Sequence, residues 1–131
     1  MNILSIASAA VTFSLVAIHG ASAQQPGIKR TDLVKNDIVV SGKEAIQVRV
    51  DFDPGAFAVN HRHPGEEIAY VLEGALEYKL EGRGAIILTA GQSLFIPYGV
   101  AHSARNVGSG NASELATYIV TKGSPLVEPV Q

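Results

Sequence analysis

The chain has 131 residues, which fits one domain, and 47% hydrophobic with 17% charged residues is the composition of a folded protein rather than a disordered one. A net charge of −2 without a Lys/Arg cluster argues against nucleic acid as a partner. Cysteine is absent, so no disulfide can form and no thiolate can act as nucleophile or metal ligand. Any metal site must use histidine, carboxylate, hydroxyl or amide groups.

The N-terminal segment has the pattern of a secretory signal peptide. Its first 28 residues carry no Lys, Arg, Asp or Glu, and an apolar stretch over residues 3–18 precedes the small-residue site Ala21-Ser22-Ala23. The apolar stretch is shorter than the ~20 residues of a membrane-spanning helix. The basic residue that usually precedes the apolar stretch of a signal peptide is missing here. We expect cleavage after Ala23, a mature chain over residues 24–131 without a membrane span, and export to the periplasm or the extracellular space.

Short strands are expected from residue 44 onward, after an entry segment that contains Pro26 and Gly27. Residues 44–52 show the clearest pattern, because every second position is apolar and so falls on one face: Ile46, Val48, Val50 and Phe52. Glycine or proline ends each of the following segments. The further expected strands are 57–63, 67–72, 76–80, 85–88, 93–96, 102–107 and 115–121.

Eight short strands without a convincing long helix predict an all-β fold. Closure protects strand edges, so we expect a single small antiparallel β-barrel or two-sheet roll with its core at about 44–121. The tail, residues 123–131, contains two prolines. It is expected to be an irregular arm that covers the barrel or a neighbouring subunit.

Three histidines and a glutamate have spacing that suits a metal site. His61 and His63 would point to the same face of a strand, and Pro64-Gly65 would turn the chain so that Glu67 reaches the same point. His102 would join them if its strand pairs beside this hairpin. A lone histidine is more often a surface or hydrogen-bonded residue, but three imidazoles with one carboxylate suit Mn, Fe, Co, Ni, Cu or Zn. In an octahedral ion they would leave two positions open.

The same residues fall within two longer motifs with matching spacing. The first runs through Gly55, His61, His63, Glu67 and Gly74, and the second through Gly91, Pro97, Gly99, His102 and Asn106. In both motifs the chain resembles the cupin superfamily, in particular its small single-domain bacterial members of the conserved-barrel, type-2 group. The resemblance covers about residues 47–121. It implies a cupin or jelly-roll barrel, often dimeric, with His61, His63, Glu67 and His102 as metal ligands.

Strand parity gives expectations for the neighbours of these ligands. Counted from Glu67, Ala69 and Val71 face the barrel interior, whereas Tyr70 faces outward, at a candidate subunit contact. Counted from His102, Ala104 faces inward. Glu66 is expected to diverge from Glu67 and to be solvated or ion-paired.

Expectations also follow for Asn106, Tyr98, Gln47 and Arg49. We expect Asn106 to form structural hydrogen bonds rather than to bind metal. Tyr98 is a candidate for the barrel mouth. The facing of Gln47 and Arg49 stays open, since an inward Arg49 would contact the substrate and an outward one solvent or a partner.

The resemblance does not determine a reaction, because function depends on the site rather than the fold. The first hypothesis is a dioxygenase-like oxidoreductase that uses one divalent transition metal (Fe, Mn, Ni, Cu or Zn) on a small metal-chelating substrate. The second is a non-redox lyase, isomerase or decarboxylase in which the ion is a Lewis acid. The third is a non-catalytic small-ligand-binding protein. No catalytic residue beyond the ligands is assigned, and a homodimer is expected.

Overall fold

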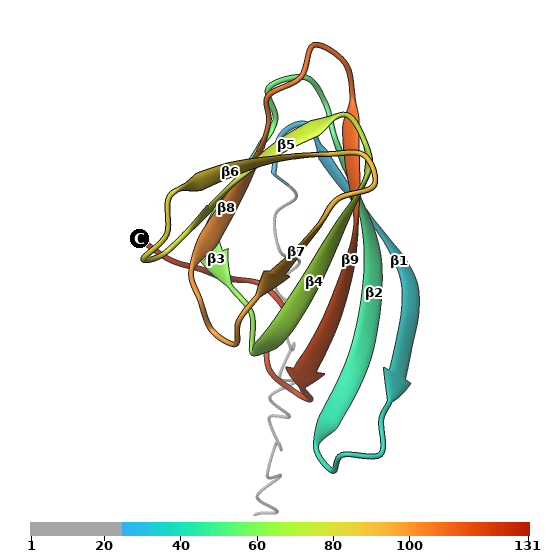
Figure 1. Cartoon of the computed structure of the whole chain (residues 1–131). Helices are drawn as coiled ribbons and strands as arrows, with labels where there is room; N and C mark the ends of the chain where they lie inside the picture. Colours follow the sequence, from blue (N-terminus) through green and yellow to red (C-terminus); the bar gives the residue numbers. More distant parts are fainter. Residues whose placement is uncertain (1–24) are drawn as a thin grey trace, which may run out of the picture.

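A computed structural model of the chain describes residues 25–131, and the predicted signal peptide lies outside these residues (Figure 1). The described part contains ten strands and no helix. The strands are β1 (Ile28–Asp37), β2 (Lys43–Phe52), β3 (Phe57–Arg62), β4 (Gly65–Glu73), β5 (Ala75–Leu80), β6 (Ala85–Thr89), β7 (Ser93–Ile96), β8 (His102–Asn106), β9 (Ala112–Thr121) and β10 (Glu128–Pro129). Residues 25–131 therefore include no helical segment with the length and hydropathy that a bilayer crossing requires.

Two five-stranded antiparallel sheets face each other in a jelly-roll arrangement. Their strand orders are β1-β2-β9-β4-β7 and β10-β3-β8-β5-β6, and Figure 1 shows the two layers on either side of the barrel interior. We call them the β9 sheet and the β8 sheet after their central strands. The arrangement confirms the predicted all-β, cupin-like fold, although within residues 25–131 no ladder of hydrogen bonds joins the two sheets into one closed ring.

All eight predicted strands are present, with ends that differ by at most three residues, but two strands were not predicted. β1 has the sequence IKRTDLVKND, in which no apolar alternation is visible, and most of its side chains are exposed at the edge of the β9 sheet. β10 is a two-residue strand in the tail and pairs with β3. The tail therefore covers this barrel, which was one of the two places expected for it.

Alternate positions of the strands fill the core between the sheets. Ala69 and Val71 are fully buried and Ala104 is 4% exposed, whereas Tyr70 is 41% exposed, as parity predicted. Burial of such side chains contributes roughly 25 cal/mol per Å² of apolar surface. The other large side chains of the core include Val48, Val50, Phe52, Leu76, Tyr78, Ile96, Tyr118 and Val120.

The structure settles the facing of Gln47 and Arg49, which both lie on the outer face of β2. The Arg49 Nε atom is 2.9 Å from Asp51 Oδ1, and Gln47 Nε2 donates to Thr117 Oγ1 at 3.2 Å. Both partners also belong to the outer face. Neither residue can therefore contact a ligand inside the barrel.

Gly65 lets β4 approach β9 closely enough to place Glu67. A Cβ atom at Gly65 would lie 1.9 Å from the carbonyl oxygen of Ile119, so no side chain fits there. Two residues later, Glu67 pairs with Tyr118 and points inward. The turn at Pro64-Gly65 therefore delivers the carboxylate to the barrel interior, as the sequence predicted.

Asn106 fastens the end of β8 to the end of β2. Its Nδ2 atom donates to the carbonyl oxygens of Phe52, Asp53 and Gly110 at 3.2, 3.1 and 2.8 Å, and its Oδ1 accepts from the Gly108 N–H at 3.0 Å. The side chain is 2% exposed. Its predicted structural role is confirmed.

Candidate metal centre

Three imidazoles meet inside the barrel. His61 near the end of β3 pairs with His102 at the start of β8, and His63 follows β3 directly. One ring nitrogen from each histidine lies within 4.8 Å of the other two, and all three side chains are buried. The sequence predicted this convergence from the His61-x-His63 spacing and the later His102.

The opposite nitrogen of each ring is bonded to the backbone. Nδ1 of His61, His63 and His102 lies 2.7, 2.5 and 2.9 Å from the carbonyl oxygens of Val59, Leu126 and Val100. A carbonyl can only accept, so each Nδ1 carries the proton and each Nε2 presents a lone pair. Such a second hydrogen bond orients the histidines of metal sites and sets their tautomer.

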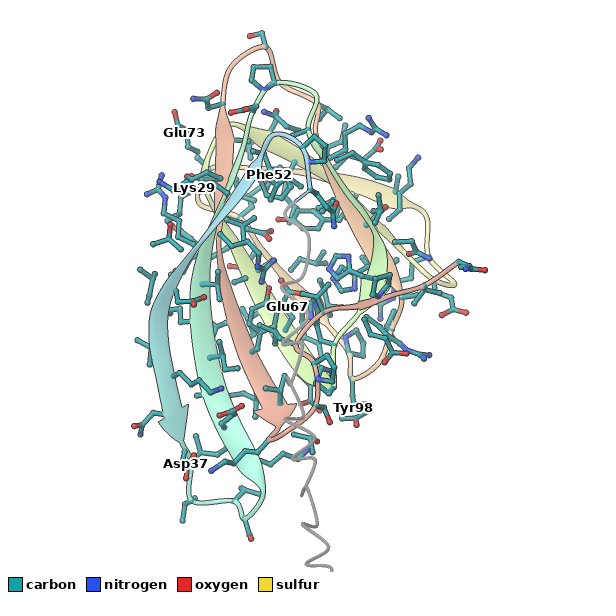
Figure 2. The ribbon with its side chains drawn as sticks, turned by 180° about the vertical axis from the view of Figure 1, so that it is seen from behind. Lys29, Asp37, Phe52, Glu67, Glu73 and Tyr98 are labelled. Atoms are coloured by element: carbon teal, nitrogen blue, oxygen red, sulfur yellow. The ribbon has the colours of Figure 1, made fainter. Side chains whose placement is uncertain are left out.

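The Glu67 carboxylate reaches the same point from β4 (Figure 2). Its Oε2 atom lies 2.9 Å from His63 Nε2 and 3.2 Å from His102 Nε2, and the residue is 3% exposed. Within residues 25–131, His63 Nε2 and Glu67 Oε2 are buried without a well-formed hydrogen bond. The lone pairs of these two atoms face one another and repel unless a cation lies between them. The donor set therefore fits a divalent ion.

Burial and neighbouring groups shift the pKa values of His61 and Glu67 toward the forms that bind metal, whereas the Glu67 carboxylate outweighs burial at His102 and raises the pKa of that imidazole. Burial and the nearby His102 lower the pKa of His61 to about 4. Burial alone would raise the pKa of Glu67, but the adjacent imidazoles of His102 and His63 outweigh burial and hold that pKa well below its usual range. At neutral pH His61 is therefore neutral and Glu67 is ionised, as metal coordination requires.

The cluster borders a cavity of about 560 Å³ between the two sheets. This volume falls within the range of small-molecule sites. The cavity is lined by Gln25, Ile28, Arg30, Asp32, Val50, Phe52, Ala58, His61, Glu67, Tyr78, His102, Ala104, Glu114, Tyr118, Pro125, Leu126 and Val127.

The cavity holds a second buried carboxylate, Glu114. The Tyr78 hydroxyl donates a short hydrogen bond to Glu114 Oε2. Burial, together with repulsion from Glu67, raises the pKa of Glu114 to about 7, although the Tyr78 hydrogen bond and the Arg30 charge act in the opposite direction. A carboxyl group with such a pKa can take up and release a proton near neutral pH.

The remaining predictions concern Tyr98 and Glu66. Tyr98 is 56% exposed and is absent from the cavity lining, and the Lys43 Nζ atom lies 5.3 Å from its ring centroid (Figure 2). Glu66 pairs with Ile119 on the outer face of β4, so it diverges from Glu67 as expected. Neither residue belongs to the candidate site.

Arg30, Tyr78, Glu114 and Tyr118 line the cavity but were not assigned to it from the sequence. Tyr118 lies in the predicted strand 115–121 and shares the parity of the buried Ala116 and Val120, and extending that strand by one residue would have placed Glu114 on the same face. Tyr78 likewise alternates with Leu76 and Leu80. Arg30 had no such signal, because β1 was not recognised as a strand.

Comparison with known proteins agrees with this geometry. The model of the family described as "Cupin domain" matches residues 48–123. "Polyketide synthase CurC" of Streptomyces cyaneus is 45% identical over 60 residues, which cover 45% of this chain but only 38% of that protein. The chain thus spans well under half of this curated relative.

Two solved structures share the architecture. A cupin-like protein from Thermotoga maritima superposes with a TM-score of 0.68 and 26% identity, covering 85% of this chain and 82% of the other. A recombinant oxalate oxidase in complex with glycolate gives a TM-score of 0.65 and 26% identity, covering 84% of this chain and 58% of the other.

Proposed function

This chain belongs to the cupin domain family, and from that premise we propose that it binds one divalent transition metal through His61, His63, Glu67 and His102. One observation carries the proposal: one nitrogen from each of three buried imidazoles converges on one place, the Glu67 carboxylate lies beside two of them, His63 and His102, and each Nδ1 is already bonded to a carbonyl. The donor set suits Fe, Mn, Ni, Cu or Zn.

The ligand is proposed to be a small molecule that chelates the ion from the cavity. Four protein ligands leave two positions of an octahedral ion open, and a bound ion supplies Lewis acidity or, if redox-active, electron transfer. The chain's own residues would surround that molecule and limit its contact with water. A cavity of about 560 Å³ accommodates a small organic acid but not a polymer.

We propose a dioxygenase-like oxidoreductase as the first reaction class. It is supported by the mixed imidazole and carboxylate donor set with open positions, which suits redox-active ions. It is also supported by the similarity to oxalate oxidase, although this chain covers 58% of that protein. The substrate in this class would be a small acid that binds the ion through two oxygens.

A second class, a non-redox lyase, isomerase or decarboxylase, is favoured by the Glu114–Tyr78 pair. Both side chains line the cavity and neither belongs to the proposed ligand set. A carboxyl group that titrates near neutral pH, in contact with a hydroxyl, can move a proton to or from a bound molecule. In this class the ion would only polarise the ligand.

The experiment compares defined metal forms of the protein. Metal-free protein is reloaded with Fe, Mn, Ni, Cu or Zn and mixed with small hydroxy and oxo acids, including glycolate and oxalate. Oxygen uptake and product formation are then followed. Substrate-dependent oxygen uptake with a redox-active ion supports the first class, and turnover by the zinc form without oxygen supports the second. Tight binding without turnover in every metal form would contradict both and leave a ligand-binding protein.

Export and dimer formation are also proposed. The signal-peptide pattern supports export, and sequencing of secreted protein should give an N-terminus near Gln24. Ile68, Tyr70 and Phe95 are exposed on the outer face of paired strands β4 and β7, which supports a subunit contact there. Light scattering should then give twice the mass of one mature chain, and a monomer mass at micromolar concentration would contradict the dimer.

A further inference from the structure

Arg30 extends from β1 into the cavity that holds the histidines. It pairs with Val50, whose side chain is 1% exposed and points into the core. The guanidinium lines the cavity, and its Nη2 atom donates to Tyr118 Oη at 3.1 Å. Arg30 is thus a half-buried cation on the inner face of the β9 sheet.

The charge of Arg30 is not neutralised by a close partner within residues 25–131. No carboxylate oxygen there lies within 4.0 Å of its guanidinium, whereas Arg49 and Arg62 pair with Asp51 and Glu128 at 2.9 and 2.5 Å. Burial of a charge without a partner is costly. A cation that faces a cavity in this way is suited to bind an anion that enters the cavity.

The hydroxyl of Tyr118 is the second group available to such an anion. Its oxygen accepts from Arg30, and within the described residues its own proton is given to no acceptor. Tyr118 is 1% exposed, so solvent does not replace that acceptor. A guanidinium and a hydroxyl side by side offer several N–H and O–H donors to one carboxylate.

The net charge of the cavity also favours an anionic ligand once a metal ion is bound. Without metal, the buried carboxylates Glu67 and Glu114 outnumber the single guanidinium of Arg30. A divalent ion would reverse this balance and leave at least one excess positive charge. Asp32 also lines the cavity, but its side chain is solvent exposed and therefore screened. The metal-loaded cavity thus favours an anionic ligand.

We propose that the ligand is a small dicarboxylic acid, with one carboxylate at the metal and the other bound by Arg30 and Tyr118. The inference rests on the proposed metal site and narrows its substrate class. Arginine suits this role because its planar fork matches a carboxylate with two parallel hydrogen bonds. Within the described residues, the cavity lining has no other Arg or Lys that could take the second carboxylate.

The test uses zinc-loaded protein and three diacids of increasing length, malonate, succinate and glutarate. Each is compared with its monomethyl ester, which has almost the same size but lacks one charge. Isothermal titration should show that at least one diacid binds about tenfold or more tightly than its ester, as expected for a charge-assisted pair. If wild-type protein prefers no diacid over its ester, the proposal is overturned.

Arg30→Gln identifies the residue responsible, and Arg49→Gln on the outer face is the matched control. Arg30→Gln should reduce the preference for the diacid over its monomethyl ester to less than about twofold, whereas Arg49→Gln should leave this preference unchanged. Arg30→Lys keeps the charge and serves if Arg30→Gln does not fold. It should lower the preference at least about threefold, because an ammonium lacks the planar fork. An unchanged preference in a folded Arg30 variant would overturn the proposal.

Zinc content, measured in every sample, separates a failure of the proposed metal site from a failure of the proposed role of Arg30. Wild-type protein without zinc would contradict the metal site itself. Full zinc in both wild-type and Arg30→Gln protein, together with the same diacid preference, would overturn only the role of Arg30.

Discussion

The two sheets contribute different chemistry to the same cavity. The β8 sheet supplies imidazoles, with His61 in β3 and His102 in β8. The β9 sheet supplies the charged groups: Arg30 in β1, Glu67 in β4 and Glu114 in β9. The cavity therefore has one wall that carries imidazoles and an opposite wall whose charged groups set its net charge.

The two walls are also held in different ways. Each imidazole is oriented by a backbone carbonyl, which moves only if the chain moves. Arg30 and Glu114 are instead held by tyrosine side chains, Tyr118 and Tyr78. Changes in the β8 sheet should therefore affect coordination and folding, whereas changes in the β9 sheet should affect charge, ligand choice and pH dependence.

The largest effect is expected at Glu67, where the charged wall meets the imidazoles. If four ligands share equally the ~10–16 kcal/mol of a structural zinc site, Glu67→Ala should cost about 3 kcal/mol and weaken zinc binding more than a hundredfold. Competition with a chromogenic chelator measures this loss. Glu66→Ala on the outer face is the control, and equal affinities for the two variants would refute the assignment of Glu67.

An effect of similar size is expected at Asn106, which belongs to the β8 sheet and is tied to the end of β2. Asn106→Ala removes a buried amide, so three carbonyl oxygens and the N–H of Gly108 each lose a hydrogen-bond partner. The free energy of unfolding should fall by about 3 kcal/mol. Urea unfolding of the metal-free protein tests this, and a loss below 1 kcal/mol would show that water replaces these bonds.

Glu114 should produce the smallest of these effects, and one that depends on pH. Its pKa in the folded protein is about 7, above the ordinary value of 4.5. The folded state therefore binds more protons than the unfolded state between these pH values, and this group makes stability fall as pH rises through that window.

Glu114→Gln removes this titration and keeps the acceptor for Tyr78. Relative to wild type, the metal-free variant should gain about 2 kcal/mol of stability between pH 5 and pH 7. Urea unfolding at both pH values measures the difference. A stability difference that is constant with pH would show that Glu114 does not titrate in this range.

The sequence predicted the fold and the imidazole wall well because both depend on local patterns. Period-two alternation and the glycine and proline residues between segments located eight strands, and the His61-x-His63 spacing brought two rings together by parity. The Gly65 turn then placed Glu67. The pairing of β3 with β8, which adds His102, was expected only from the longer motif that the chain shares with cupins.

The charged wall was largely missed, for two physical reasons. β1 is an edge strand whose exposed Lys, Asp and Asn side chains hide the alternation, so Arg30 was not assigned to the interior. Glu114 lies one residue before the predicted strand 115–121 and was not assigned to the interior, because a buried glutamate at the start of a strand contradicts the usual preference for apolar residues inside. Such departures from the pattern are common at functional sites.

Metal content tests the central claim most directly. Protein is purified with its native metal, and elemental analysis is applied to wild type and to the double variant His61→Ala with His102→Ala. We predict close to one equivalent of a transition metal per wild-type chain and less than about a tenth in the variant, which loses two of four ligands. One full equivalent in the double variant would contradict the proposed metal centre.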